Sequence, residues 1–253
     1  MPNNSLTKKF ATFNDYISNV SNRDRVVSVV QFTAMALAAP AAAAGYPKLS
    51  VHLNTVHHSA AHYRSLTRFS QWLVVAPALT PNGIKSVITS NPNPLVGICK
   101  TICTALFTVF LIGEELVLAS KCDMLDPVLG KMINRIRFVF LFWSNIGRLV
   151  LNYLLLKSSK YDALKDSQNE AKVKEHRRKV LSVADSVLQC VFCYTLLKNS
   201  VPAGPKYLGA ALQSGKVVDI ITSLAPPPVV VPSTPQGLLG LLASVPGFMI
   251  SVL

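Results

Sequence analysis

The stretch that decides the fold class is FVFLFWSNIGRLVLNYLLL, residues 138–156. It is long and apolar enough to cross the hydrocarbon core of a bilayer as an α-helix. Arg135 and Arg137 precede it and Lys157 follows it. Arg148 is the one charged residue inside it. It needs a partner or a water-filled cavity, or its long side chain must extend to the membrane surface. The stretch therefore predicts a transmembrane helix.

The composition of the whole chain agrees with a membrane protein. Of the 253 residues, 50% are hydrophobic and 15% are charged, whereas about a quarter of a soluble domain is charged. The formal net charge is +13, which favours an anionic partner, either a lipid surface or nucleic acid. Because the basic residues flank apolar helices and no nucleic-acid-binding motif is present, we expect an anionic phospholipid membrane and no nucleic acid.

Two further apolar segments lie on either side of this stretch. Residues 101–113 are apolar but short for a span, and extending them to Ala119 takes in Glu114 and Glu115. Adjacent carboxylates in hydrocarbon are costly unless they are paired or hydrated. Residues 180–197 form another apolar helix, interrupted by Asp185, which is a possible intramembrane partner for Arg148 if the two helices pack. Both segments are either spans or packed helices.

The C-terminal end of the chain has a second predicted span. Residues 237–253 carry no charge, and the Gly and Pro within them are better tolerated in lipid than in water. Before them lies a Pro-rich linker at 225–236. We expect a domain order of a cytosolic amphipathic region at 1–75, a linker at 76–94, a membrane-associated bundle at 95–224, the Pro-rich linker and the C-terminal transmembrane segment.

The N-terminal region is amphipathic instead. The spacing of Phe10, Phe13 and Ile17 predicts a first helix over 5–19. Ser21 or Asn22 then predicts a cap for a second helix, with Asp24 in its first turn. That helix runs to Ala39 and is broken or bent at Pro40.

Residues 48–73 form the clearest amphipathic segment, with apolar and basic residues at helical spacing. A basic helix with aromatic anchors suits the surface of an anionic bilayer. A core helix in a soluble bundle fits the periodicity equally well. The predicted membrane-binding residues are Leu49, Leu53, Val56, Tyr63, Arg64, Arg68, Phe69 and Trp72.

The motifs of enzymes and cofactor sites are missing from the sequence. No nucleophile elbow, phosphate-binding loop or dinucleotide glycine motif is present. His58 and His62 stand one helical turn apart, but no third metal ligand lies nearby in the sequence. The odd number of cysteines, five, argues against a disulfide framework. We expect no enzyme activity, no metal and no cofactor.

The order of these elements resembles the peroxin-eleven family of peroxisomal membrane proteins. The family's second helix starts with Gly-Arg-Asp-Lys and is followed later by an Arg-rich helix. Here NRDRVVSVVQF, residues 22–32, places Arg23, Asp24, Arg25 and Gln31 in matching positions, with Asn22 replacing the glycine and Arg25 the lysine. HYRSLTRFSQWL, residues 62–73, corresponds to the Arg-rich helix. The Pro-rich linker and apolar tail look most like the glycosomal integral membrane protein branch of kinetoplastids.

The resemblance implies an all-α, membrane-associated helical bundle with about two transmembrane helices and cytosolic termini in the peroxisomal or glycosomal membrane. Its expected function is membrane remodelling and elongation that controls organelle proliferation, size and fission, with self-association among family members. The alternative is a pore for small metabolites, for which Glu114, Arg148 and Asp185 are candidate lining residues. Residues 175–194, with the basic cluster Arg177, Arg178 and Lys179, resemble a targeting signal read by the peroxin-nineteen import receptor. A charged loop entering a helix explains the same segment.

Overall fold

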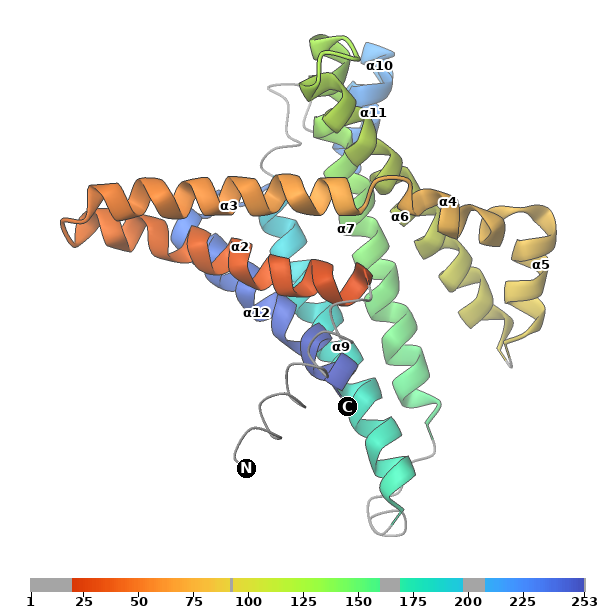
Figure 1. Ribbon diagram of the computed structural model, residues 1–253. Coiled ribbons are helices and arrows are strands. Elements are labelled where there is room, and N and C mark those ends of the chain that lie inside the picture. Colours follow the sequence, from red (N-terminus) through yellow and green to blue (C-terminus); the bar gives the residue numbers. More distant parts are fainter. Residues whose placement is uncertain (1–19, 92, 160–168, 198–207, 253) are drawn as a thin grey trace, which may run out of the picture. The chain divides into compact units, whose positions relative to one another are not determined.

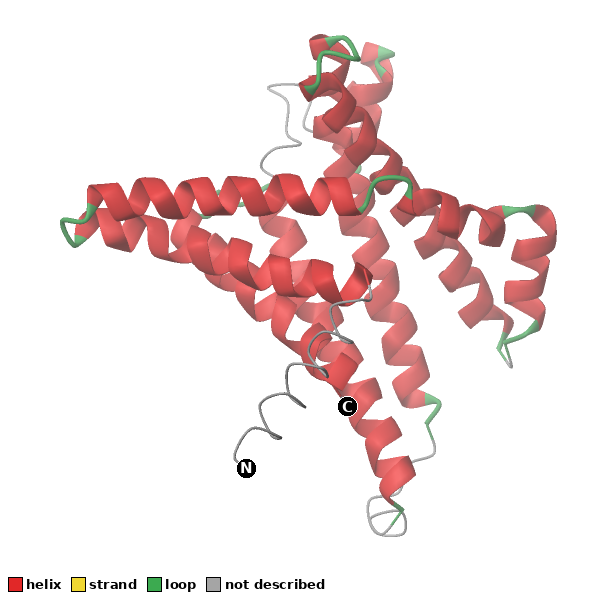
Figure 2. Ribbon diagram, viewed as in Figure 1, coloured by secondary structure: helices red, strands yellow, loops and turns green. Residues whose placement is uncertain are grey.

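The fold is entirely helical over the residues that the structure describes. The computed structural model describes residues 20–91, 93–159, 169–197 and 208–252, which hold ten α-helices, one 3-10 helix and no strand (Figures 1 and 2). This confirms the predicted all-α class. The chain forms two compact units. Unit 1 contains residues 1–67 and 232–253, so it joins both ends of the chain, and unit 2 contains residues 68–231.

Unit 1 is built around α2 (Val20–Ala43), which packs against α3 (Pro47–Thr67) and against α12 (Ser233–Val252). The turn between α2 and α3 is closed by Gly45, whose φ of 84° lies in the left-handed region that favours glycine. The amide of Tyr46 bonds the carbonyl of Ala41 at 2.9 Å, and the amide of Gly45 bonds that of Ala42 at 3.1 Å. These two bonds are the Schellman pattern that ends a helix.

The contact between α2 and α12 depends on small residues. A Cβ added to Gly237 would lie 2.6 Å from the backbone nitrogen of Ala36, and one added to Gly240 would lie 2.5 Å from the ring of Phe32. Ala36 and Phe32 are themselves buried. Glycines at such positions let helix backbones approach closely, which is a common way for helices to associate in membranes.

Unit 2 is built around a hairpin of two long helices, α6 (Pro94–Lys121) and α7 (Pro127–Lys157). Helix α9 (Glu170–Leu196) packs on α7. The buried core between them consists of Val139, Phe142, Cys193 and Leu197. Before α6 lie α4 (Gln71–Val75), the 3-10 helix η1 (Ala76–Leu79) and α5 (Pro81–Thr89). After α9 come α10 (Leu208–Ser214) and α11 (Val217–Ser223).

The long helices of unit 2 begin at side-chain caps. The carboxamide oxygen of Asn93 accepts the amide of Leu95 at 3.0 Å, and the carboxylate of Asp126 accepts the amide of Val128 at 2.9 Å. Asn169 caps α9 in the same way. A proline follows the first two caps directly, where its missing N–H costs nothing. These local signals place the helix starts.

The structure differs from four of the predicted boundaries. The predicted cap at Ser21 or Asn22 is wrong, because α2 already includes Val20 and continues through both residues. Pro40 lies inside α2, one turn before its end. The predicted linker at 76–94 contains η1 and α5, and the Pro-rich linker ends at Pro232 because α12 starts at Ser233. The helix predicted at 5–19 lies outside the described residues.

Within the described residues, four helices are long and apolar enough to cross a membrane. They are 22–43, 94–121, 127–157 and 170–196, and only 22–33% of the most apolar window of each is buried inside the protein. The exposed apolar side chains on such helices are suited to contact with a membrane or a partner. The predicted span at 138–156 lies within α7. The first helix on this list lies in the region predicted to be cytosolic, and the span predicted in α12 stays a prediction.

Candidate functional site

The predicted membrane-binding helix presents its apolar residues to the outside of unit 1. Leu49, Val56 and Tyr63 have exposed fractions of 49%, 43% and 40%. Their neighbours Val51 and Leu66 are exposed further, at 64% and 60%. Leu53 is half-buried, and Ala60 is the one residue of α3 that is buried. Helix α3 therefore has an uncovered apolar surface beside the face that packs on α2.

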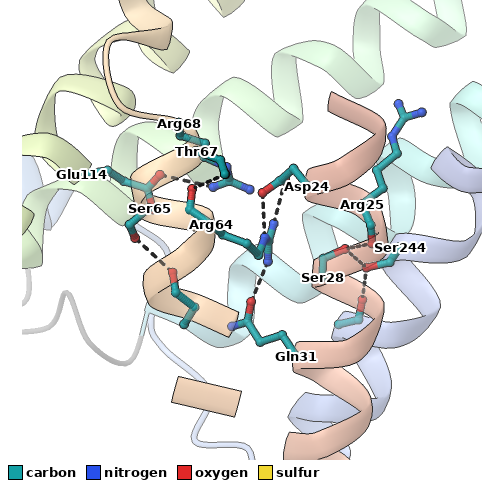
Figure 3. Close-up of polar contacts among 12 residues, drawn as sticks. Asp24, Arg25, Ser28, Gln31, Arg64, Ser65, Thr67, Arg68, Glu114 and Ser244 are labelled. Carbon is teal, nitrogen blue, oxygen red and sulfur yellow. Dashed lines mark hydrogen bonds and ion pairs between the residues drawn. The ribbon is translucent and has the colours of Figure 1, made fainter. Parts of the chain in front are cut away.

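The arginine of this helix is held inside unit 1 instead. Arg64 Nε bonds Asp24 Oδ1 at 2.9 Å, its Nη2 bonds Asp24 Oδ2 at 3.2 Å, and its Nη1 bonds Gln31 Oε1 at 2.8 Å (Figure 3). Its guanidinium carbon lies 5.7 Å from the centre of the Phe32 ring. The Arg64 and Asp24 side chains are 16% and 18% exposed. A two-point contact of this kind orients the arginine as well as neutralising it.

Two more polar contacts connect the helices of unit 1. Ser28 Oγ donates to Ser244 Oγ at 3.0 Å, which joins α2 to α12 in a buried position (Figure 3). His57 Nδ1 lies 3.3 Å from the carbonyl oxygen of Gln31, to which it donates. Burial lowers the pKa of His57, the bond to Gln31 opposes that shift, and the neighbouring His58 adds to it. The ring is therefore neutral at pH 7.

A second cluster of charges lies within unit 2, at the junction of α4 with α6 and α7. Glu114 Oε2 accepts Arg68 Nη1 at 3.2 Å, and its Oε1 lies 3.7 Å from Arg137 Nη1. Glu115 accepts the backbone amide of Ser70 and, at 3.0 Å, the indole N–H of Trp72. Glu114 is thus paired with two arginines and Glu115 is hydrogen-bonded, which offsets their cost in an apolar helix.

The remaining predicted residues of unit 2 lie on α7 and α9. Arg148 is exposed and Asp185 is buried, on two helices that pack together, and their pairing stays a prediction. The same two helices are joined by Asn152, whose amide donates to Ser186 Oγ at 2.7 Å and to the Ser182 carbonyl at 3.1 Å. Hydrogen bonds between polar side chains are a typical link between membrane helices.

The predicted targeting cluster forms part of the first half of α9. Arg177 and Arg178 are exposed, and Lys179 Nζ pairs with Glu175 Oε1 of the same helix at 2.7 Å. The segment is helical here, and its role in targeting stays a prediction. Among the described residues, no group of three His, Cys, Asp or Glu side chains could hold a metal ion.

The structure brings together residues that the sequence pattern assigned to separate roles. Asp24 and Gln31, from the predicted signature, bind Arg64, from the predicted membrane-binding helix. Arg68 and Trp72, also predicted to face lipid, bind the carboxylates of α6. A signal was present in the sequence, because Asp15 and Asp24 are the two acidic residues among the first 113. Burying the carboxylate of Asp24 on an apolar helix is costly unless a cation neutralises it, so a basic partner could have been expected.

Comparison with known families gives one match. The sequence model of the family described as Peroxisomal biogenesis factor 11 (PEX11) matches residues 10–212. The match covers the described parts of α2 to α9 and ends within α10, so α11 and α12 lie beyond it. No curated protein and no solved structure matches the chain.

Proposed function

The chain belongs to the peroxisomal biogenesis factor 11 (PEX11) family, and on that premise we propose that it remodels and elongates the peroxisomal membrane before fission. The family consists of biogenesis factors and is not a known enzyme family, and its members reside in the peroxisomal membrane. A protein that inserts apolar side chains into one leaflet expands that leaflet and favours curvature.

The observation that supports the proposal is the uncovered apolar surface of α3. Five large apolar side chains of this helix have exposed fractions of 40–64%, listed from the N-terminal end as Leu49, Val51, Val56, Tyr63 and Leu66. The adjacent face of the helix is held against α2 by the Arg64 contacts. A rigid unit that displays such a surface can insert it shallowly into a bilayer without unfolding. The net charge of +13 directs the chain to anionic lipid.

The test compares full-length variants on vesicles and in cells. Changing Leu49, Val56 and Tyr63 to serine removes three exposed apolar side chains and no internal contact of those described. We expect weaker tubulation of vesicles that contain anionic phospholipid, and shorter, fewer peroxisomes in cells that lack their own copy. The control changes Asn54 and Ser59, which are exposed polar residues of the same helix, to serine and alanine. Equal tubulation by both variants, with equal helical content, contradicts the proposal.

The alternative function, a pore for small metabolites, has a specific requirement. It needs polar side chains that line a path, and one of its candidate lining residues, Glu114, is engaged by two arginines. Planar-bilayer conductance of the inserted full-length protein tests it. A flat current eliminates the pore, and a conductance that changes in an Arg148→Gln variant supports it.

Three further proposals concern self-association, targeting and family branch, and each is supported by a single observation. Self-association fits the uncovered apolar surface of α3 and is tested by cross-linking in the membrane. Recognition by the peroxin-nineteen import receptor fits the basic cluster of Arg177, Arg178 and Lys179, and is tested by mistargeting of a variant with three glutamines there. Membership of the glycosomal branch rests on residues 225–253, which lie beyond the family match, and is tested by co-localisation with glycosomal enzymes in kinetoplastid cells.

A further inference from the structure

The segment between Ser70 and Asn91 runs along α6 from one end of its apolar part to the other. At one end Trp72 bonds Glu115. At the other, a Cβ on Gly97 would lie 2.6 Å from Cα of Ile88, so the two backbones are in direct contact. Glu115 and Gly97 are 18 positions apart in one α-helix, which is about 27 Å. The hydrocarbon core of a bilayer is about 30 Å thick.

Charged residues mark both ends of this distance within unit 2. Glu114, Glu115, Arg68 and Arg137 cluster at one end, together with Trp72, a residue type enriched where membranes meet water. We call it the Glu114 end. The opposite end carries Pro94 at the start of α6, Lys157 at the end of α7 and Lys179 of α9.

The three long helices α6, α7 and α9 lie side by side between these two ends. A Cβ on Gly113 would lie 3.0 Å from Cβ of Arg137, and one on Gly147 would lie 2.5 Å from Sγ of Cys103. Helix α9 is aligned with α7 by the bond from Asn152 to Ser186. All three therefore extend between the same two ends, and each is long and apolar enough to cross a membrane.

The chain enters unit 2 at the Glu114 end, and its last contacts within unit 2 lie nearer to that end than to the other, because Trp143 is six positions, about 9 Å, from Arg137. It enters at Arg68, which pairs with Glu114. After α9, Trp143 donates to the Leu224 carbonyl at 3.0 Å, and the Tyr194 hydroxyl donates to the Pro227 carbonyl at 2.7 Å. From Pro227 the chain reaches Pro232 in five residues, about 17 Å when fully extended. Trp143 lies 14 positions before the end of α7, about 21 Å from the opposite end.

Because the chain enters unit 2 at the Glu114 end and α6 starts at the opposite end, the residues between them pass from one end to the other, as α6, α7 and α9 each do. We propose that residues 70–91 are the fourth crossing, a discontinuous membrane segment in which the outer face of α4 lies against lipid hydrocarbon. Leu73 and Val74, on the part nearest the Glu114 end, are 53% and 82% exposed. Apolar side chains this exposed on a segment beside a spanning helix are suited to lipid contact.

The breaks in this segment leave few backbone groups unpaired, which is the condition for irregular backbone at membrane depth. Pro77 and Pro81 lie at the breaks and have no N–H to satisfy. Thr80 Oγ1 accepts the amide of Gly83 at 3.2 Å and donates to the Pro77 carbonyl at 2.8 Å. The outer face of α5 is polar and includes Lys85, which can extend to the membrane surface near Pro94.

Cysteine labelling of the full-length protein in isolated organelles tests this topology. The native cysteines are changed to alanine except Cys122, which is exposed in the loop between α6 and α7. Companion variants place a single cysteine at His62, an exposed polar position of α3, or at Ser90 or Ser159 instead. The reagent is a polyethylene-glycol maleimide too large to pass a membrane, added before and after the membrane is opened with detergent.

We expect His62→Cys and Cys122 to react from one side of the membrane, and Ser90→Cys and Ser159→Cys to react from the other. Labelling of Ser90→Cys from the same side as His62→Cys overturns the proposal, and so does a Ser90→Cys variant that reacts only in denaturant. If alanine at the native cysteines prevents folding, protease sites inserted after Thr67, where α3 ends, and after Ser90 in the native chain give the same comparison. Cleavage of both from one side overturns the proposal.

Discussion

Arg64 shows how a basic residue on a helix predicted to bind lipid can have a structural role instead. Its side chain is directed to Asp24 and Gln31, although it lies on the helix predicted to contact lipid headgroups. A guanidinium held at two oxygens has given up most of its freedom to contact a headgroup. The exposed apolar side chains of α3 are therefore the better candidates for contact with the membrane.

The Asp24–Arg64 pair is expected to stabilise unit 1. A double-mutant cycle with Asp24→Asn and Arg64→Gln should give a coupling energy of about 1–3 kcal/mol, measured from unfolding in mixed detergent micelles. The matched control is the Glu175–Lys179 pair within α9, where Glu175 is 66% exposed. Solvent screening should make its coupling much smaller. Equal couplings for the two pairs would contradict this role of Arg64.

His57 should make the stability of unit 1 depend on pH. Its pKa lies below the ordinary value of 6.5, chiefly because of burial, so protons bind the unfolded state more tightly than the folded state. Stability is complete above pH 6.5 and falls as the pH drops below that value. A His57→Gln variant should lose less stability between pH 7 and pH 5 than the unchanged protein. A His62→Gln variant, altered at an exposed position, should keep the full pH dependence.

At the scale of the helix, packing in unit 1 depends on the lack of a side chain at two positions of α12. Gly237 faces the backbone of α2, which cannot move aside, and Gly240 faces the ring of a buried phenylalanine. The apolar segment at 237–253 was predicted from its hydropathy alone. These two glycines let α12 approach α2 closely, and this close approach selects α2 as the partner of α12.

A Gly240→Leu substitution should separate α12 from α2. The added side chain has no room beside Phe32, and overpacking of this kind typically costs about 1–3 kcal/mol. The readout is disulfide formation between cysteines placed at Ser28 and Ser244, whose hydroxyl oxygens are 3.0 Å apart. We expect a clear loss of cross-linking. Gly209→Ala, at a position with nothing within 4 Å, should leave cross-linking unchanged.

At the scale of the whole molecule, the two ends of the chain depend on each other. Unit 1 joins residues 1–67 with residues 232–253, so the C-terminal helix completes the packing of α2. Contacts between segments this far apart in sequence close a long loop, and the packing that they gain must offset the entropy of that closure.

Shortening the chain at Val231 should therefore destabilise its N-terminal region. Without α12, α2 loses its contacts with Gly237, Gly240 and Ser244. We expect faster proteolysis within α2 and α3 in the membrane, and unchanged proteolysis of α6, α7 and α9. Expression of residues 225–253 as a separate chain should restore part of the protection. Unchanged proteolysis of α2 and α3 in the shortened chain would show that α12 is dispensable for unit 1.

The sequence by itself determined the elements and their class. Local signals sufficed for the long apolar stretch at 138–156, which lies within α7. They failed at Ser21 and Asn22, where a good cap residue lies inside a helix, because tertiary contacts outweigh a capping bond of about 1 kcal/mol. The linker predicted from prolines at 76–94 failed for a related reason. Proline at the first position of a short helix is favourable, as at Pro81.

Only the tertiary structure decided which elements meet. Hydropathy identifies a surface that must be covered but not its partner, because apolar contact is not directional. The pairing of Asp24 with Arg64, of Glu115 with Trp72, and of α2 with α12 joins residues 40, 43 and more than 200 positions apart. Such contacts depend on how whole helices pack, and no local periodicity records them. They also decide which charges stay inside the protein and which apolar side chains are left for the membrane.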